Sequence, residues 1–172
     1  MSSFLNSRVL KINVGFLLHD GPAHSQDSKL DIPAVKVADD LIFDYVRGPI
    51  RLSRTTEGIL VQANLHIGIK AECYRCLDEV NHDVEVTIEE LFTHHSQANL
   101  EFSIDDDAIL DLGPLLRAEV LIAASYGVLC KPDCKGLCQE CGTNLNHETC
   151  ECSQKPIDPR FAKLKELLDS GS

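Results

Sequence analysis

Residues 57–72 alternate between apolar and polar side chains almost without interruption. Successive side chains of a β-strand point to opposite faces, so this period of two predicts a strand over 59–72 with one buried face. Residues 79–90 continue the pattern and predict a neighbouring antiparallel strand. The apolar positions are Ile59, Val61, Ala63, Leu65, Ile67, Ile69 and Ala71, then Val80, Val84, Val86 and Ile88. The connection CYRCLD then forms a hairpin tip that carries Cys73 and Cys76.

Similar alternation upstream predicts further strands. Apolar residues occupy every second position over 10–18, and apolar and polar residues alternate over 50–53. TTEG at 55–58 is expected to be the turn into the long strand. Residues 20–31, which contain Asp, Ser, Gly and Pro, are expected to be a mobile loop. Residues 1–110 are therefore expected to form an antiparallel β domain with a curved or barrel-like sheet.

The pattern changes at residue 111, where apolar residues begin to recur at spacings of three and four. This spacing predicts a helix. Asp111 is a candidate N-cap, Pro114 lies in the first turn, and Gly127 can end the helix. We expect residues 111–129 to connect the β domain to the C-terminal part of the chain.

Eight cysteines are the most unusual feature of the composition, and six of them lie in the segment from Cys130 to Cys152. The N-terminus lacks the pattern of a signal peptide, and no apolar stretch is long enough to span a bilayer. We therefore expect a cytoplasmic protein with no membrane partner. Disulfides are rare in the reducing cytosol, so clustered thiols there indicate metal binding or redox chemistry.

The motif Cys138-x2-Cys141-Gly142 has the spacing of a zinc knuckle. Zinc takes four ligands, so several cysteine pairs must combine. The favoured site uses Cys138, Cys141, Cys150 and Cys152, with His147 as a reserve ligand. A second site would join Cys73 and Cys76 to Cys130 and Cys134. The cysteine count permits either one zinc ion or two.

Residues 130–172 are expected to form a small zinc-binding module that ends in a short helix. Asp158 would cap this helix and Pro159 would occupy its first position. Its apolar face would contain Phe161, Leu164, Leu167 and Leu168. The expected fold class is thus α+β: an antiparallel, barrel-like β domain, a connecting helix, and a Cys-rich C-terminal module.

All-thiolate zinc sites are closed and structural, whereas catalytic sites keep an open position. The sequence has no HExxH, GxSxG or phosphate-loop motif. We therefore expect no enzymatic activity, no catalytic residues and no small-molecule substrate. The alternative is a thiol redox or metal-relay protein that uses Cys73 and Cys76. A redox pair usually opens a helix, however, and this pair joins two strands.

The net charge of −11 excludes binding to nucleic acid by overall electrostatic attraction. Contact with RNA would need a local basic patch, for which Lys131, Lys135 and Lys155 beside the cysteines are candidates. The acidic β domain is instead suited to a basic partner protein.

Four stretches together resemble the bacterial and plastid YceD family, the large-ribosomal-RNA-accumulation proteins. They are ECYRCL, CKPDCKGLCQECGTNLN, CEC and DPRFAKLKELL, and they occur in this order. The resemblance implies a role in 23S ribosomal RNA accumulation and large-subunit assembly. It implies large-subunit precursors, ribosomal RNA or basic ribosomal proteins as partners. It also implies that Cys130, Cys134, Cys138, Cys141, Cys150 and Cys152 are metal ligands, with Cys73 and Cys76 in the hairpin motif.

Overall fold

The computed structural model describes residues 5–19, 24–94, 102–124 and 127–152. Its strands are β1 (Leu5–Asn6), β2 (Lys11–Asn13), β3 (Ser25–Ile32), β4 (Val35–Ala38), β5 (Leu41–Arg54), β6 (Gly58–Glu72), β7 (Glu79–His94), β8 (Ser103–Ile104) and β9 (Ile109–Asp111). Its helices are the 3-10 helix η1 (Ser7–Leu10), α1 (Gly15–His19) and α2 (Gly113–Ala124). In this part of the chain, no helix has the length and apolar character that crossing a membrane requires.

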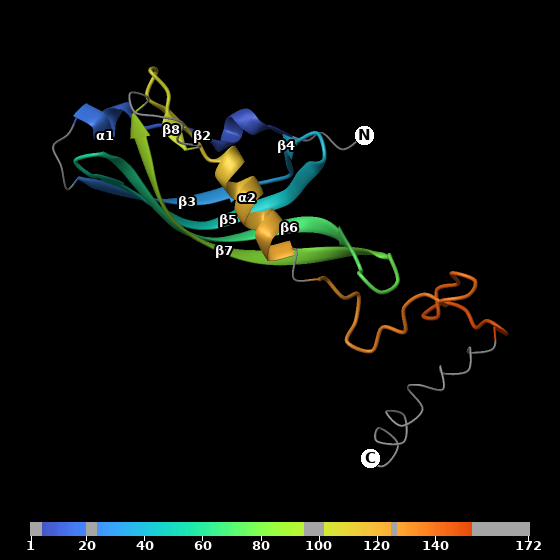
Figure 1. Cartoon of the computed structure of the whole chain (residues 1–172). Helices are drawn as coiled ribbons and strands as arrows, with labels where there is room; N and C mark the ends of the chain where they lie inside the picture. Colours follow the sequence, from blue (N-terminus) through green and yellow to red (C-terminus); the bar gives the residue numbers. More distant parts are fainter. Residues whose placement is uncertain (1–4, 20–23, 95–101, 125–126, 153–172) are drawn as a thin grey trace, which may run out of the picture.

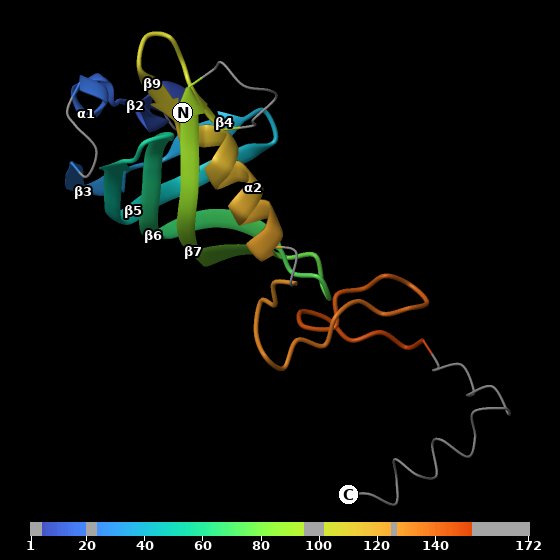
Figure 2. The same ribbon diagram turned by 60° about the vertical axis from the view of Figure 1, so that its left-hand side comes forward.

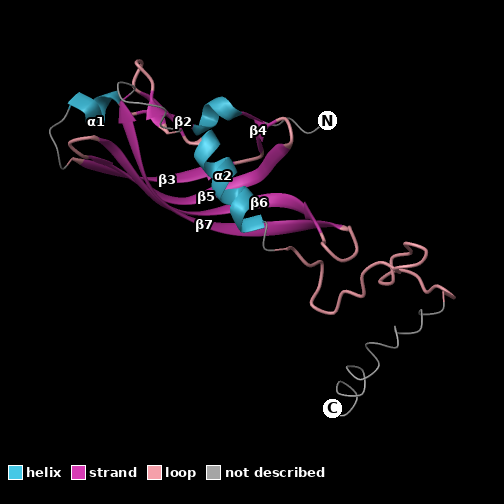
Figure 3. Cartoon of the chain, viewed as in Figure 1, coloured by secondary structure: helices cyan, strands magenta, loops and turns pink. Residues whose placement is uncertain are grey.

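The strands form one curled sheet in the order β1-β4-β5-β6-β7-β8-β9-β2, and β3 pairs with β5 beside this path. Most pairs are antiparallel, as expected, but β1–β4 and β7–β8 are parallel, so the sheet is mixed. Helix α2 lies across the open side of the curl and contacts β7 and β4 (Figures 1 and 2). The Cys-rich segment leaves the end of α2 as loops beside the β6–β7 hairpin (Figure 3).

The prediction of two long paired strands is confirmed by β6 and β7. Their register runs from Gly58 opposite Thr93 to Glu72 opposite Glu79, and the connection holds Cys73 and Cys76. Every second residue of β6 from Ile59 to Ile69 is buried, whereas Asn64, His66, Lys70 and Glu72 on the other face are exposed. Because the buried positions are the apolar ones, the hydrophobic core lies on the concave side of the sheet. The TTEG turn is also confirmed, since the Thr55 amide donates to the Gly58 carbonyl at 2.9 Å.

The helix predicted from residue 111 is confirmed as α2, although it begins at Gly113 because Asp111 ends β9. The Asp111 carboxylate accepts a hydrogen bond of 2.8 Å from the Gly113 amide, which satisfies a free donor of the first turn. The apolar face is buried at Leu115, Leu116 and Val120. Residues 158–168, predicted to form a second helix, lie outside the described residues.

The strand predicted over 10–18 is wrong except for the three residues of β2. The Asn13 side chain accepts a hydrogen bond of 2.9 Å from the Gly15 amide, which starts α1 instead. The residues that reach the core are Leu10, Val14 and Leu17, which have helical rather than strand spacing. Phe16, which alternation would bury with Val14, is exposed.

The loop expected over 20–31 is also wrong for its second half, which belongs to β3. This strand is exposed at all positions before Leu30. Its sequence therefore lacks the alternation of apolar and polar residues that would have predicted a strand. Its pairing with β5 is accompanied by ion pairs from Arg47 to Asp31 and from Arg51 to Asp27. Residues 20–23 lie outside the described residues.

The solvent-facing side of the sheet carries a cross-strand cluster of Tyr45, His66 and Asp83. The Tyr45 hydroxyl donates to one oxygen of Asp83, and His66 Nδ1 lies 3.0 Å from the other. The Tyr45 ring lies over Gly68, where a Cβ would come within 2.4 Å of the ring. The hydrogen bond to Asp83 raises the pKa of His66, and the partners Tyr45 and His66 lower the pKa of Asp83.

The contacts in this cluster predict that the pKa of His66 depends on the carboxylate of Asp83. Asp83→Asn should lower the pKa of His66 towards the ordinary histidine value, which NMR titration of its imidazole protons would measure. Because the folded-state pKa of His66 is raised, its stabilisation is complete below about pH 6.5 and declines as the pH rises through that pKa. The exposed Asp105 provides a control, since Asp105→Asn should leave His66 unchanged. An unaltered pKa in Asp83→Asn would contradict the assignment.

Candidate metal centres

The hairpin tip between β6 and β7 folds into a tight knuckle around Cys73 and Cys76. The Cys73 amide donates to the Asp78 carbonyl at 2.9 Å, and the Leu77 amide donates to the Cys73 carbonyl at 2.9 Å. Leu77 takes a left-handed conformation, with φ of 62°, to close this turn. Both cysteine side chains are thereby turned inward and buried.

The second C-x2-C motif repeats this geometry. The Cys138 amide donates to the Thr143 carbonyl at 2.8 Å, and the Gly142 amide donates to the Cys138 carbonyl at 2.9 Å. Gly142 has a φ of 74°, so it occupies the position that Leu77 occupies in the first knuckle. The chain therefore contains two knuckles of the same backbone design, one in the β-hairpin and one in the C-terminal segment.

The first knuckle contributes to a group of four thiols, which we call the proximal cluster: Cys73, Cys76, Cys130 and Cys134. Their sulfur atoms all lie within 4.8 Å of one another. The Cys73–Cys134 and Cys76–Cys130 sulfur distances are 3.8 and 3.6 Å. Four sulfurs at about 2.3 Å from a tetrahedral ion are about 3.8 Å apart, so the spacing fits a metal ion such as zinc. All eight cysteines are free thiols.

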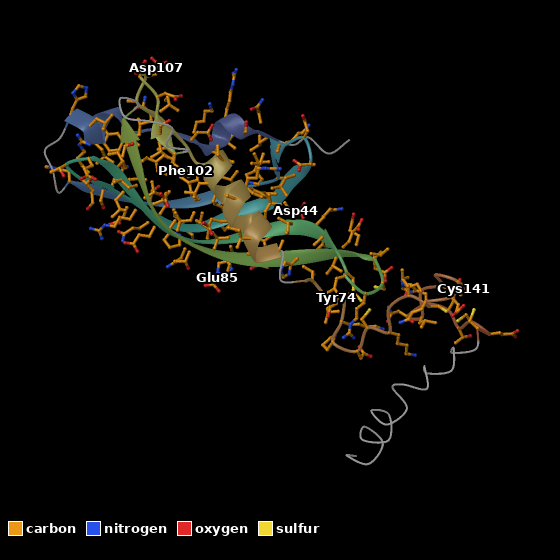
Figure 4. The ribbon with its side chains drawn as sticks, viewed as in Figure 1. Asp44, Tyr74, Glu85, Phe102, Asp107 and Cys141 are labelled. Carbon is orange, nitrogen blue, oxygen red and sulfur yellow. The ribbon has the colours of Figure 1, made fainter. Side chains whose placement is uncertain are left out.

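The second knuckle contributes to a distal cluster of Cys138, Cys141, Cys150 and Cys152, whose sulfur atoms also lie within 4.8 Å of one another. Cys141 and Cys152 are exposed, whereas three members of the proximal cluster are buried. Figure 4 places Cys141 beyond the hairpin, away from the sheet. The two groups are the same as the two sets of four considered from the sequence. Both could hold a metal ion, and thiolate ligands favour soft transition metals over magnesium or calcium.

The four proximal thiols differ in acidity. Burial raises the pKa of Cys73, but hydrogen bonds from neighbouring backbone groups outweigh it and lower that pKa to about 6. Burial raises the pKa values of Cys76 and Cys130. Burial also opposes ionisation of Cys134, but the amide of Asn146 helps to lower its pKa. Four adjacent thiolates repel one another, so a bound cation would be needed to ionise them all.

The thiols of the distal cluster also differ in acidity. The hydroxyl and backbone of Thr143 lower the pKa of Cys141 to about 6, and the hydroxyl lies 3.1 Å from the Cys141 sulfur. The hydrogen bond with Cys141 raises the pKa of Cys152 to about 12. Each cluster thus has at least one cysteine whose lowered pKa allows it to ionise at neutral pH. The resulting thiolate is the form of cysteine that binds metal.

A network of polar side chains connects the first knuckle to the distal loop. The Asn146 amide donates to the Cys134 sulfur at 3.2 Å and to Asn144 Oδ1 at 3.0 Å. The Asn144 amide donates to Asp78 Oδ1 at 2.9 Å, and His147 Nε2 lies 3.0 Å from Asp78 Oδ2. These contacts orient the metal-site loops through groups that do not themselves belong to either cluster.

Sequence reasoning did not identify Asp78, Asn144 or Asn146 as parts of the site. The available signal was the placement of short polar side chains directly after the cysteine motifs, which is typical of groups that hydrogen-bond nearby backbone and ligands. His147, the expected reserve ligand, contacts Asp78 and belongs to neither cluster. Lys155 lies outside the described residues.

Comparison with known proteins gives a consistent assignment. The profile of the family described as "Large ribosomal RNA subunit accumulation protein YceD" matches residues 61–168. An uncharacterized protein of Mycobacterium tuberculosis is 31% identical over 159 residues, which cover 89% of this chain and 74% of that protein. An uncharacterized protein of Mycobacterium leprae is 33% identical over 125 residues, covering 69% and 57%.

A plant protein is similar over a shorter stretch. The chloroplastic "Large ribosomal RNA subunit accumulation protein YCED homolog 1" of Arabidopsis thaliana is 31% identical over 60 residues, covering 35% of this chain and 19% of that protein. No solved structure matches the chain significantly.

Proposed function

The chain belongs to the YceD family, and from this premise we propose that it is a non-enzymatic zinc-binding factor for 23S ribosomal RNA accumulation and large-subunit biogenesis. The observation that carries the proposal is the extent of the family match. It begins within β6 and includes the hairpin knuckle and all eight cysteines. The plant relative is itself named for ribosomal RNA accumulation.

We propose one zinc ion in each cluster, bound by Cys73, Cys76, Cys130 and Cys134, and by Cys138, Cys141, Cys150 and Cys152. The support is the donor set of four thiols, the sulfur spacing and the two matching knuckles. Zinc, when bound, neutralises the thiolates and supplies folding free energy of about 10–16 kcal/mol. The buried members of the hydrophobic cluster at this site are themselves cysteines, and Val80, Leu129 and Leu137 pack against them only partly buried, so such an ion would be the main source of stability for the surrounding loops.

In this proposal the proximal cluster joins two parts of the molecule. Cys73 and Cys76 come from the β domain (residues 1–110), and Cys130 and Cys134 come from the module at 130–172, with the connecting helix (111–129) between them. The cluster would fix the module against the β-hairpin. The β domain then serves as a platform, and the module projects from one end of it.

The proposed partners are large-subunit precursors, through ribosomal RNA, basic ribosomal proteins or both. The cytoplasm, where bacterial subunits assemble, is the compartment that this function requires. The alternative of a redox or metal-relay protein has less support. Cys73 and Cys76 are only 0% and 3% exposed, and sulfur contacts of 3.8 and 3.6 Å join them to Cys134 and Cys130.

Depletion of the protein in its host tests the function. We expect the ratio of 23S to 16S ribosomal RNA to fall, and sucrose gradients to show fewer large subunits relative to small ones. Re-expression of the wild-type chain should restore both measurements. An unchanged ratio in cells that contain no detectable protein would reject the proposed function.

A further inference from the structure

The lysines and arginines of this protein are not equally available to an external anion. On the sheet and on helix α2 most of them are already in ion pairs: Lys11–Asp111, Lys36–Asp39, Arg47–Asp31, Arg51–Asp27, Lys70–Glu79 and Arg117–Asp40. At the cysteine clusters, Arg75, Lys131 and Lys135 are exposed, and none has a carboxylate within ion-pair distance in the described part of the chain. Arg8 of η1 and Lys29 of β3 are also exposed and have no ion pair among the described residues, but they lie on separate elements. Arg75, Lys131 and Lys135 instead lie together where the knuckle meets the Cys-rich segment.

These three cations lie around one backbone junction. Arg75 Nη1 donates to the Cys134 carbonyl at 3.1 Å, and the Arg75 carbonyl accepts from the Leu137 amide at 3.1 Å. Lys135 follows Cys134 directly, and the Lys131 carbonyl accepts from the Cys134 amide at 3.1 Å. The backbone positions of the cations are thus tied to the proximal cluster.

An exposed aromatic ring accompanies them. Tyr74, at the hairpin tip in Figure 4, is 57% exposed, although its backbone amide is fixed to the Val128 carbonyl at 3.0 Å. The Arg75 guanidinium carbon lies 5.8 Å from the ring centroid. Gly127 lies beside the ring, and a Cβ at that position would be 3.2 Å from it. The tyrosine is therefore held in place without being covered.

Leu77 places an exposed apolar side chain at the tip of the first knuckle, where the turn itself does not require a leucine. It is 59% exposed and has a φ of 62°, a conformation that is unfavourable for leucine. The second knuckle has Gly142 at the corresponding position, where glycine avoids this strain. A strained, exposed leucine at the tip is consistent with a contact outside the chain.

We propose that the tip of the first knuckle, formed by Tyr74, Arg75 and Leu77 with Lys131 and Lys135 beside it, binds unpaired RNA. The proposal rests on the proposed function and assigns its RNA contact to one surface. An unpaired base stacks on the Tyr74 ring with Leu77 at its edge, and the cations contact phosphates. Duplex RNA keeps its base faces stacked internally, so the exposed ring selects single strands.

The first test measures binding of the zinc-loaded, full-length protein to a fluorescein-labelled single-stranded oligouridine by fluorescence anisotropy. Tyr74→Ala should weaken binding about 5- to 150-fold, the range expected for the loss of one stacked base. Tyr74→Phe should bind like the wild type because the stacking surface remains. Native mass spectrometry should show the same zinc content in all three proteins.

Leu77→Gly separates binding from folding. Glycine relieves the backbone strain, so the thermal midpoint should be unchanged or higher, while RNA binding should weaken several-fold. Lys131→Gln with Lys135→Gln should lower the slope of log Kd against log salt by about 1.4, or 0.7 for each lost phosphate contact. Lys11→Gln with Lys36→Gln removes the same charge from the β domain and should leave the slope unchanged.

Equal affinity of wild type and Tyr74→Ala for the oligouridine would overturn the proposal. So would equal salt slopes in the two lysine pairs, or a tip that binds basic ribosomal proteins through Tyr74 without binding RNA. Complementation of depleted cells distinguishes this failure from failure of the function. If wild type and Tyr74→Ala restore 23S RNA equally, only the RNA surface is rejected. If wild type restores nothing, the proposed function is rejected.

Discussion

Replacement of Cys73 by Ser is expected to lower the zinc content from two ions per chain to one. Serine supplies a poorer ligand, and a structural zinc site with three thiolates loses most of its affinity. The β domain should remain folded, because its main hydrophobic cluster does not contain the proximal cysteines. Native mass spectrometry would give the stoichiometry, and far-UV circular dichroism would report the sheet.

Cys141→Ser is the matched control in the distal cluster. It should also leave one zinc ion, but the intact proximal cluster would still join Cys73 and Cys76 to Cys130 and Cys134. Limited proteolysis should therefore cut between α2 and the second knuckle faster in Cys73→Ser than in Cys141→Ser. The cluster is expected to be the main attachment there, because the other links between the hairpin tip and the Cys-rich segment in the described part of the chain are individual hydrogen bonds, such as Arg75 to the Cys134 carbonyl and Asn144 to Asp78.

A zinc content other than two ions per chain would change the assignment of the metal sites. One zinc ion in the wild type that Cys141→Ser removes would confine the site to the distal cluster and leave Cys73 and Cys76 as thiols. No zinc in protein purified without chelator or oxidant would reject the zinc assignment. If thiol titration then showed Cys73 and Cys76 cycling between reduced and oxidised forms, the redox alternative would replace it.

Gly48→Ala is expected to destabilise the β domain by about 3 kcal/mol or more. Gly48 has a φ of 148°, and a Cβ there would come within 2.1 Å of the Asn64 carbonyl oxygen. That oxygen belongs to β6, the strand that pairs with β5, so the overlap can be relieved only by moving paired backbone. Urea unfolding followed by circular dichroism at the sheet signal would measure the loss.

Gly142→Ala separates the effect of conformation from the effect of space. Gly142 also has positive φ, but nothing lies within 4 Å of a Cβ built there. The cost should therefore be limited to about 1 kcal/mol of backbone strain in the second knuckle, and the urea midpoint of the β domain should not change. Equal unfolding free energies for Gly48→Ala and wild type would contradict the structure at the β5–β6 pair.

Local periodicity was enough to locate the centre of the fold. The alternation in 59–72 and 79–90 correctly predicted β6, β7 and a hairpin tip with Cys73 and Cys76. The prediction succeeded because one face of these strands is buried and the other is solvated. The polarity of each side chain therefore indicates which face its position belongs to. The helix α2 was similarly marked by apolar spacing and by Asp111.

The same reasoning failed where burial does not follow a single period. Strand β3 is mostly exposed on both faces and is defined by its pairing with β5, which its own sequence does not reveal. At the N-terminus, alternation suggested a strand, but contacts of Leu10, Val14 and Leu17 with the core favour helical turns. Tertiary contacts override a short local pattern in such segments.

By itself the sequence determined which side chains are suited to bind metal, because the C-x2-C spacing and the residue after it are local properties of a turn. Only the tertiary structure decided how the thiols combine. Cys73 and Cys134 are 61 positions apart, and Cys76 and Cys130 are 54 apart. Their approach depends on where β6 and β7 end and on how α2 crosses the sheet, which is set by packing between distant segments rather than by spacing along the chain.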